Sequence, residues 1–279
     1  MMELTIALLF GLAIGSFLNV CIARLPVGTS VVAPRSRCPK CHKLIAWYDN
    51  VPILSFLILR ARCRGCGLPI SVRYPMVEAL TGVVSVLLAV QYGLGPAWAL
   101  YLAFAASMIV LVLIDMDHRI LPDVITLNGI WIGVLVSLYL AMPSPFVSRL
   151  FLMAGSDVPG PRVVALVASL AGIAFGGGLL WFVREAFFRI RGIEGMGFGD
   201  VKMMAMAGAF LGLPLTLLTI MLGSVAGSVI GLTFIRLFDK GRDYELPFGT
   251  FLGAGAVIAV LYGNALIRFY MDTMFPPMT

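Results

Sequence analysis

Apolar stretches long enough to cross a bilayer recur along the whole chain. A membrane-spanning helix needs about 20 apolar residues, within a range of about 17–25. The chain is 60% hydrophobic and only 12% charged, whereas soluble domains are about 45–50% apolar and about 25% charged. We therefore predict an all-α polytopic membrane protein with about eight transmembrane helices, the sixth of them short. The candidate spans are residues 3–23, 76–92, 96–114, 124–142, 163–183, 200–212, 214–236 and 248–270.

The first apolar segment is predicted to be a true span rather than a cleaved signal peptide. It begins Met1-Met2-Glu3, without the basic region that opens a signal peptide, and it continues past Cys21 without a small-x-small cleavage site. Cys21 is expected to be a small apolar packing residue within this helix.

Positive charges predict the orientation of the chain. Seventeen of the 20 Lys and Arg residues fall in alternate loops on one side of the eight-span arrangement, and only Arg149, Arg162 and Arg268 fall on the other. By the positive-inside rule, the basic side is cytoplasmic and both termini lie outside. The net charge of +6 then reflects topology, and no nucleic-acid partner is expected. The main outer loop, residues 143–162, is rich in Pro, Ser and Gly and is expected to be irregular.

The longest cytoplasmic loop, residues 25–75, contains two Cys-x-x-Cys pairs. Cys38 and Cys41 form the first pair, and Cys63 and Cys66 follow after 21 intervening residues. Two such pairs can supply four thiolates to a tetrahedral zinc ion, and four thiolates leave no open position for water. We therefore predict a structural zinc site in a small loop domain. Disulfides and free thiols are the alternatives, and disulfides are rare in the cytoplasm.

Two aspartates lie at the cytoplasmic ends of apolar segments. Asp115 follows the apolar run 102–114, and Asp200 ends the sequence Gly-Met-Gly-Phe-Gly-Asp at 195–200. Carboxylates at a membrane edge are costly and are retained mainly for chemistry, ion passage or pairing. Two of them on one face can share a proton, which is the basis of aspartic proteolysis. Asp115, next to the apolar run, is the more desolvated of the nearby acids and suits acid–base work.

Neighbouring polar residues have simpler interpretations. On a continuing helix, Asp117 is rotated by about 200° from Asp115 and faces away from it. Asp123 follows Pro122 and is placed to act as the N-cap of the next span. His118 is expected at the level of the lipid headgroups.

Glycines occur in two kinds of pattern. Gly195, Gly197 and Gly199 alternate before Asp200 and would let the backbone approach a substrate chain closely. Others recur at four-residue spacing, which predicts close contacts between helices: Gly172/Gly176, Gly208/Gly212, Gly223/Gly227/Gly231 and Gly249/Gly253.

Together these features resemble the bacterial type IV prepilin peptidases, in the same order over almost the whole chain. The resemblance implies a GxGD-type aspartic protease of the bacterial inner membrane. Such enzymes cut the basic leader from prepilins of the type IV pilus or from pseudopilins of type II secretion, on the cytoplasmic side. Many then methylate the new N-terminal amine with S-adenosylmethionine. The resemblance rests on four features of the sequence. They are Gly15-Ser16-Phe17-Leu18-Asn19-Val20, the twin Cys-x-x-Cys loop, Asp115 with Leu121-Pro122-Asp123, and the motif ending at Asp200.

The resemblance implies specific roles and a division of the chain. Asp115 and Asp200 map onto the catalytic pair, Gly197 and Gly199 onto the active-site loop, and the four cysteines onto the zinc ligands. The expected parts are a first transmembrane helix (1–24), a zinc-binding domain associated with methyl transfer (25–75) and the protease core (76–279). This chain departs from the family at Asp49, where Glu is frequent, and at Ala61, where Gly is frequent; both lie in the loop linked with methylation.

Methyl transfer needs a cofactor pocket, and the 25–75 loop is the one cytoplasmic segment large enough to help build it. The first span and the start of the second would complete it, which makes Gly15, Ser16, Asn19 and Glu78 candidate methyltransferase residues. Glu78 is a carboxylate at a membrane edge and would hold or deprotonate the amine. Its alternative role is that of a helix-start residue stabilised by the helix dipole.

Two other classes of function compete with proteolysis. A proton- or cation-coupled transporter would use the aspartates as carriers, but it predicts acids near mid-span with access from both sides. A zinc-bound membrane scaffold would leave both aspartates dispensable. A zinc protease and a serine protease are disfavoured, because neither H-E-x-x-H nor G-x-S-x-G occurs in the chain.

Overall fold

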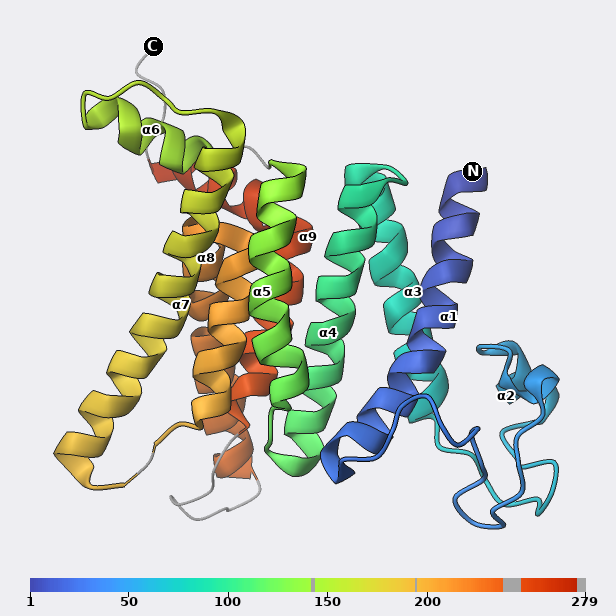
Figure 1. Cartoon of the computed structure of the whole chain (residues 1–279). Helices are drawn as coiled ribbons and strands as arrows, with labels where there is room; N and C mark the ends of the chain where they lie inside the picture. The colour runs from blue at the N-terminus through green and yellow to red at the C-terminus, as the bar shows by residue number, and fades with distance from the viewer. Residues whose placement is uncertain (142–143, 194, 238–246, 275–279) are drawn as a thin grey trace. The chain divides into compact units, whose positions relative to one another are not determined.

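The computed structural model describes residues 1–141, 144–193, 195–237 and 247–274. Within these residues the regular elements are all helices, and the β structure is limited to two isolated bridges, Arg37–Leu44 and Arg62–Pro69. Seven of the described helices are long and apolar enough to cross a membrane. This confirms the predicted all-α, multi-pass architecture. The chain divides into two compact units, Met1–Val110 and Leu111–Thr279, which are described separately below (Figure 1).

The first unit pairs two apolar helices around small and polar side chains. A Cβ atom at Gly11 would lie 2.5 Å from the Cβ of Ser85, so the two helices approach closely there. The Ser85 hydroxyl donates to the Ala7 carbonyl at 2.7 Å, and the Trp98 indole donates to the Ser85 carbonyl at 3.0 Å. The elements of this unit are α1 (Met2–Arg24), η1 (Leu25–Val27), η2 (Trp47–Asn50), α2 (Leu54–Ile58), α3 (Arg73–Tyr92) and the first part of α4 (Pro96–His118).

The second unit is a bundle that packs through glycine-lined helix faces. The backbones of Gly172 and Gly208 are in direct contact, and the Ser169 hydroxyl donates to the Ala209 carbonyl at 2.9 Å beside them. Gly223 likewise faces the backbone of Leu252. These contacts confirm the small-residue packing predicted there. The elements are the end of α4, α5 (Asp123–Leu140), α6 (Pro145–Met153), α7 (Pro161–Arg191), α8 (Phe198–Leu237) and α9 (Phe248–Met274).

The longest helical element, α8, is two limbs joined by a reversal at Gly212. Gly212 has a non-helical backbone (φ 68°, ψ 176°) and is followed by Pro214. A Cβ at Gly176 would lie 2.5 Å from the Met204 carbonyl oxygen and 2.9 Å from Cγ2 of Thr216. A straight helix would hold positions 204 and 216 about 18 Å apart. The predicted sixth and seventh segments are therefore both present as the limbs of a helical hairpin.

The segment between α5 and α7 corrects one expectation. Residues Pro145–Met153 form the helix α6 rather than an irregular loop. The Ser144 hydroxyl accepts a hydrogen bond from the Val147 N–H, and Pro145 occupies the first helical turn, where its missing N–H has no cost. Ser-Pro is thus a helix start here. Among the basic residues used to predict topology, Lys240 and Arg242 lie outside the described residues.

The contact between Gly172 and Gly208 predicts a strong position dependence for substitutions within α7. Gly172→Ala would push a methyl group into the Gly208 backbone, whereas a Cβ at Gly178 meets nothing within 4 Å. We expect Gly172→Ala to destabilise the protein by about 1–3 kcal/mol through overpacking. Gly178→Ala, in the same helix, should leave stability unchanged or slightly raised. Thermal unfolding of both variants in detergent measures this, and equal Tm values would contradict the packing.

Candidate active site and candidate metal centre

The four cysteines of the loop between α1 and α3 converge on one point. The Sγ atoms of Cys38, Cys41, Cys63 and Cys66 all lie within 4.8 Å of one another. The Sγ atoms of Cys38 and Cys66 are 4.0 Å apart. A tetrahedral zinc ion with bonds of about 2.3 Å separates its sulfur ligands by about 3.8 Å. The donor set and spacing therefore fit a metal ion, as the sequence predicts.

Each cysteine pair lies on a small turn with the same hydrogen bonds. In the first turn, the Cys38 N–H donates to Lys43 at 3.0 Å and the Cys38 carbonyl accepts from His42 at 2.9 Å. In the second, the Cys63 N–H donates to Leu68 at 2.9 Å and its carbonyl accepts from Gly67 at 2.8 Å. The corresponding residues His42 and Gly67 both have a left-handed backbone, with φ of 57° and 69°.

Backbone donors favour the thiolate form at the first turn. Hydrogen bonds from the backbone of Cys41 and of Lys40 lower the pKa of the Cys38 thiol to about 6. A metal ion binds the thiolate rather than the thiol. His42, which follows Cys41 in the chain, is not part of the described cluster of ligating atoms.

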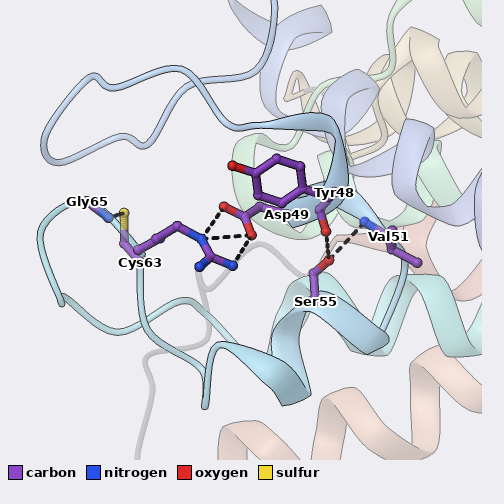
Figure 2. Close-up of polar contacts among 7 residues, drawn as sticks. Tyr48, Asp49, Val51, Ser55, Cys63 and Gly65 are labelled. Carbon is purple, nitrogen blue, oxygen red and sulfur yellow. Dashed lines mark hydrogen bonds and ion pairs between the residues drawn. The ribbon is translucent and has the colours of Figure 1, made fainter.

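An ion pair links the second turn to the short helix η2. The Arg64 guanidinium donates to both carboxylate oxygens of Asp49, at 2.7–3.1 Å, and this hydrogen bonding lowers the pKa of the Asp49 carboxyl. Nearby, the Ser55 hydroxyl donates to the Tyr48 carbonyl and accepts from the Val51 N–H, both at 3.0 Å (Figure 2). Asp49, the departure from the family pattern, is thus the partner of an arginine that lies between two metal-ligand candidates.

The candidate methyltransferase residues of the two membrane helices lie together in the first unit. A Cβ at Gly15 would lie 2.6 Å from Cα of Glu78, so α1 and α3 touch there. The Asn19 amide donates to the carbonyls of Gly15, at 3.3 Å, and of Tyr74, at 3.1 Å. Asn19 therefore ties the two helices to each other near the point where the loop leaves and re-enters them.

Glu78 connects this helix pair to the loop. Its Oε2 accepts a hydrogen bond from the Ile53 N–H at 2.8 Å, and its side chain is also hydrogen-bonded to Ser16. Ile53 has φ 59° and ψ −48°, a backbone conformation that is unusual for a β-branched residue. Glu78 is thus buried and hydrogen-bonded, and it holds a strained loop residue against the helices.

The structure brings Asp115 and Asp200 together in the second unit. Asp115 lies in the last turn of α4 and is 5% exposed, and Asp200 lies in the first turn of α8 and is 7% exposed. A Cβ at Gly249 would lie 2.6 Å from Oδ1 of Asp200 and 3.0 Å from Oδ2 of Asp115. The two oxygens are therefore close enough for one water molecule or one carbonyl group to contact both.

The glycines before Asp200 allow this turn to form against its neighbours. The Gly197 carbonyl accepts from the Asp200 N–H at 3.2 Å, and the Gly197 backbone also hydrogen-bonds the Asp200 carboxylate. A Cβ at Gly199 would lie 2.9 Å from the Cβ of Leu121, and one at Gly195 would lie 2.6 Å from the Phe187 ring. Glycine thus permits close packing at positions 195 and 199, which fixes the place of Asp200.

Two residues of this site were not identified from the sequence. The Thr250 N–H and hydroxyl both point at Oδ2 of Asp115, at 2.7 and 3.0 Å. Gly249, which was expected to make a helix contact, instead has the two carboxylates as its nearest neighbours. One sequence feature could have indicated them: the last apolar segment begins at the same end of the bundle as both aspartates.

The other acids near Asp115 are placed elsewhere. Asp117 and His118 are exposed, as expected for residues beyond the apolar run. Asp123 is the first residue of α5, and its predicted role as N-cap is wrong because Pro122 holds that position. Asp123 instead pairs with Lys202, whose Nζ lies 2.8 and 2.9 Å from its two oxygens. This pair joins the starts of α5 and α8.

These features define a polytopic membrane protein with two buried, adjacent carboxylates and a separate four-thiolate cluster. The chain matches the Bacterial Peptidase A24 N-terminal domain over residues 9–92, which include the four cysteines, and the Type IV leader peptidase family over residues 102–232, which include both aspartates. The chain belongs to the type IV leader peptidase family, which confirms the resemblance seen in its sequence.

Curated relatives cover nearly the whole chain and carry the name prepilin leader peptidase/N-methyltransferase. The relative from Aeromonas hydrophila is 36% identical, over 96% of this chain and 93% of its own length. The relative from Pseudomonas putida is 35% identical, over 97% and 94%, and that from Legionella pneumophila is 34% identical, over 94% and 92%. No solved structure matches the chain. The comparisons give no support to the transporter alternative.

The thiolate cluster predicts about one tightly bound metal ion per chain. Cys63→Ser should remove most of the bound metal, because three thiolates and a hydroxyl bind a soft ion poorly. His42→Gly removes an imidazole but suits the left-handed backbone at that position, so its metal content should stay unchanged. Elemental analysis of protein purified without chelator measures both. A loss of metal in His42→Gly would make His42 a ligand, and metal-free wild type would rule out the centre.

Proposed function

We propose that this chain is a membrane aspartic endopeptidase that removes the leader peptide from type IV prepilins or type II secretion pseudopilins. The observation that carries the proposal is the convergence of Oδ2 of Asp115 and Oδ1 of Asp200 on one point beside Gly249. The family and the names of the relatives support the substrate class. The chain is accordingly placed in the bacterial inner membrane.

The proposed mechanism uses the two carboxylates as an acid–base pair. One carboxylate takes a proton from a water molecule while the other donates a proton to the scissile carbonyl oxygen. The water oxygen bonds to the carbonyl carbon and gives a tetrahedral diol. Return of a proton to the amide nitrogen then breaks the C–N bond and releases the leader carboxylate and the new amine. The Gly197 and Gly199 backbone shapes the turn that presents Asp200.

The orientation proposed for the site follows from charge. In the second unit, Arg119 follows the end of α4 and Lys202 lies near the start of α8, the two helix ends that carry the aspartates. Arg189 and Arg191 lie in the last turn of α7, which precedes α8 in the chain. By the positive-inside rule this end is cytoplasmic. A basic leader peptide would then lie at the anionic headgroup surface while its apolar segment enters the membrane.

We further propose that residues 25–75 form a structural zinc domain and that residues 76–279 form the protease core. The four thiolates of Cys38, Cys41, Cys63 and Cys66 would hold the ion and leave it no open position for substrate. The ion would stabilise the fold of the loop and would take no part in a reaction. Transfer of a methyl group from S-adenosylmethionine to the new amine is proposed for the helix ends around Gly15, Ser16, Asn19 and Glu78.

The protease assignment predicts unequal effects of three similar substitutions. Asp115→Asn and Asp200→Asn should each reduce cleavage of a prepilin by at least about 10³-fold, because the pair acts as a unit. Asp117→Asn, at an exposed position, should retain most activity. Mass spectrometry of the product N-terminus measures cleavage by purified protein. Equal losses in all three variants, or normal cleavage by Asp200→Asn, would overturn the assignment.

The second activity predicts a separable methyl transfer. Glu78→Gln keeps an acceptor for the Ile53 N–H but removes the charge that would bind an amine. We expect this variant to cleave prepilin normally and to lose transfer of label from S-adenosylmethionine to a pre-cleaved pilin. Asp200→Asn should show the reverse. Transfer that survives in Glu78→Gln would limit Glu78 to holding the loop, and no transfer by an actively cleaving wild type would make the chain a peptidase only.

A further inference from the structure

Thr250 makes contacts that the catalytic pair alone does not explain. It is the third residue of α9, in a turn whose N–H groups have no acceptor within the helix. Its N–H donates to Oδ2 of Asp115 at 2.7 Å, and its hydroxyl donates to the same oxygen at 3.0 Å. The hydroxyl also lies 3.4 Å from the Val112 carbonyl, the weaker of its two contacts. One residue of the last helix therefore holds a single oxygen of Asp115 through two donors.

The rest of the pair is arranged differently. Oδ1 of Asp200 is buried and has no hydrogen-bond partner among the described residues. A Cβ at Gly249 would lie 2.6 Å from this atom and 3.0 Å from Oδ2 of Asp115, so any side chain there would force the carboxylates to move. At the start of α9, Gly249 thus leaves space for the two carboxylates, and Thr250 supplies two hydrogen-bond donors.

We propose that Thr250 is a positioning residue for the reaction, which orients the Asp115 carboxylate toward Asp200. The inference rests on the proposed protease function. Asp115 is 135 positions away in sequence and belongs to another helix. Two donors on the same oxygen restrict rotation of the carboxyl group, because both hydrogen bonds are lost when the group turns. The hydroxyl adds to this restraint, whereas the backbone N–H is present with any residue except proline.

The kinetic test compares valine and serine at this position. Thr250→Val keeps the shape and the N–H but removes the hydroxyl, so kcat for prepilin cleavage should fall about 10-fold while KM stays within about twofold. Thr250→Ser restores the hydroxyl and should recover most of the loss. Thr273→Val is the matched control, because among the described residues the Thr273 hydroxyl donates to the Phe269 carbonyl of its own helix, and its loss should leave kcat unchanged.

A measurement without turnover tests the contact itself. In hydrogen exchange on the full-length protein, the Thr250 amide should be protected, because Asp115 supplies the acceptor that the helix lacks. Asp115→Ala should make this amide exchange at least about 10-fold faster, and Asp117→Ala should not.

The outcomes separate the two proposals. An unprotected Thr250 amide in the wild type, or cleavage by Thr250→Val with unchanged kcat, would overturn the positioning role while leaving the protease assignment intact. A raised KM without a change in kcat would assign Thr250 to substrate binding and would also overturn it. If the wild type cleaves no prepilin, the proposed function fails, and the exchange rates alone then decide whether Thr250 orients Asp115.

Discussion

Burial of two carboxylates side by side is the constraint on which the second unit depends. A pair of acids in an apolar bundle is unfavourable unless neighbouring groups offer hydrogen bonds or the pair shares a proton. Asp115 and Asp200 come from different helices, and a third helix contributes both the gap at Gly249 and the donors of Thr250. The ends of α4, α8 and α9 must therefore meet at one place, and the glycine contacts along the helices make that meeting possible.

The reversal at Gly212 lets both limbs of α8 pack against neighbouring helices. The first limb of α8 begins beside Asp200 and packs along α7, and the second limb runs back along α9, where Gly223 meets Leu252. Both limbs contact Gly176 of α7, so one glycine face accommodates two passes of the chain. Small residues are effective here because helices in lipid associate through close van der Waals contact rather than through a hydrophobic driving force.

Much of this arrangement is visible in the sequence, because it depends on local patterns. Apolar length predicts the spans, Cys-x-x-Cys spacing predicts the thiolate cluster, and the position of Asp115 and Asp200 at apolar boundaries predicts that they meet. Thr250 is different, since its role comes from a contact between helices that no local pattern encodes. The pairing of Asp123 with Lys202 was missed for the same reason, and α6 was missed because Pro and Ser, which often mark loops, also begin helices.

The loop between α1 and α3 is not stabilised by apolar packing in the way that the bundle is. Within residues 25–75 only Cys38 and Ser55 are buried, so apolar packing contributes little to its order. His42, Ile53, Arg60 and Ala61 nevertheless have positive φ angles of 50–59°, which are unfavourable for residues other than glycine.

Polar interactions, rather than a hydrophobic core, hold the loop together. The thiolate cluster joins the two turns, the pair of Asp49 and Arg64 joins the second turn to η2, and Glu78 joins the strained Ile53 to the membrane helices. The left-handed backbone at Ala61 also gives a physical reason for the glycine that is frequent there in the family, because glycine adopts this conformation without strain. A loop ordered by a few polar links can lose its shape when one of them breaks, whereas the bundle, packed through many contacts, retains its fold. The proposed methyl transfer depends on the loop, and the proposed cleavage depends on the bundle. Removal of the metal should therefore abolish methyl transfer more readily than cleavage.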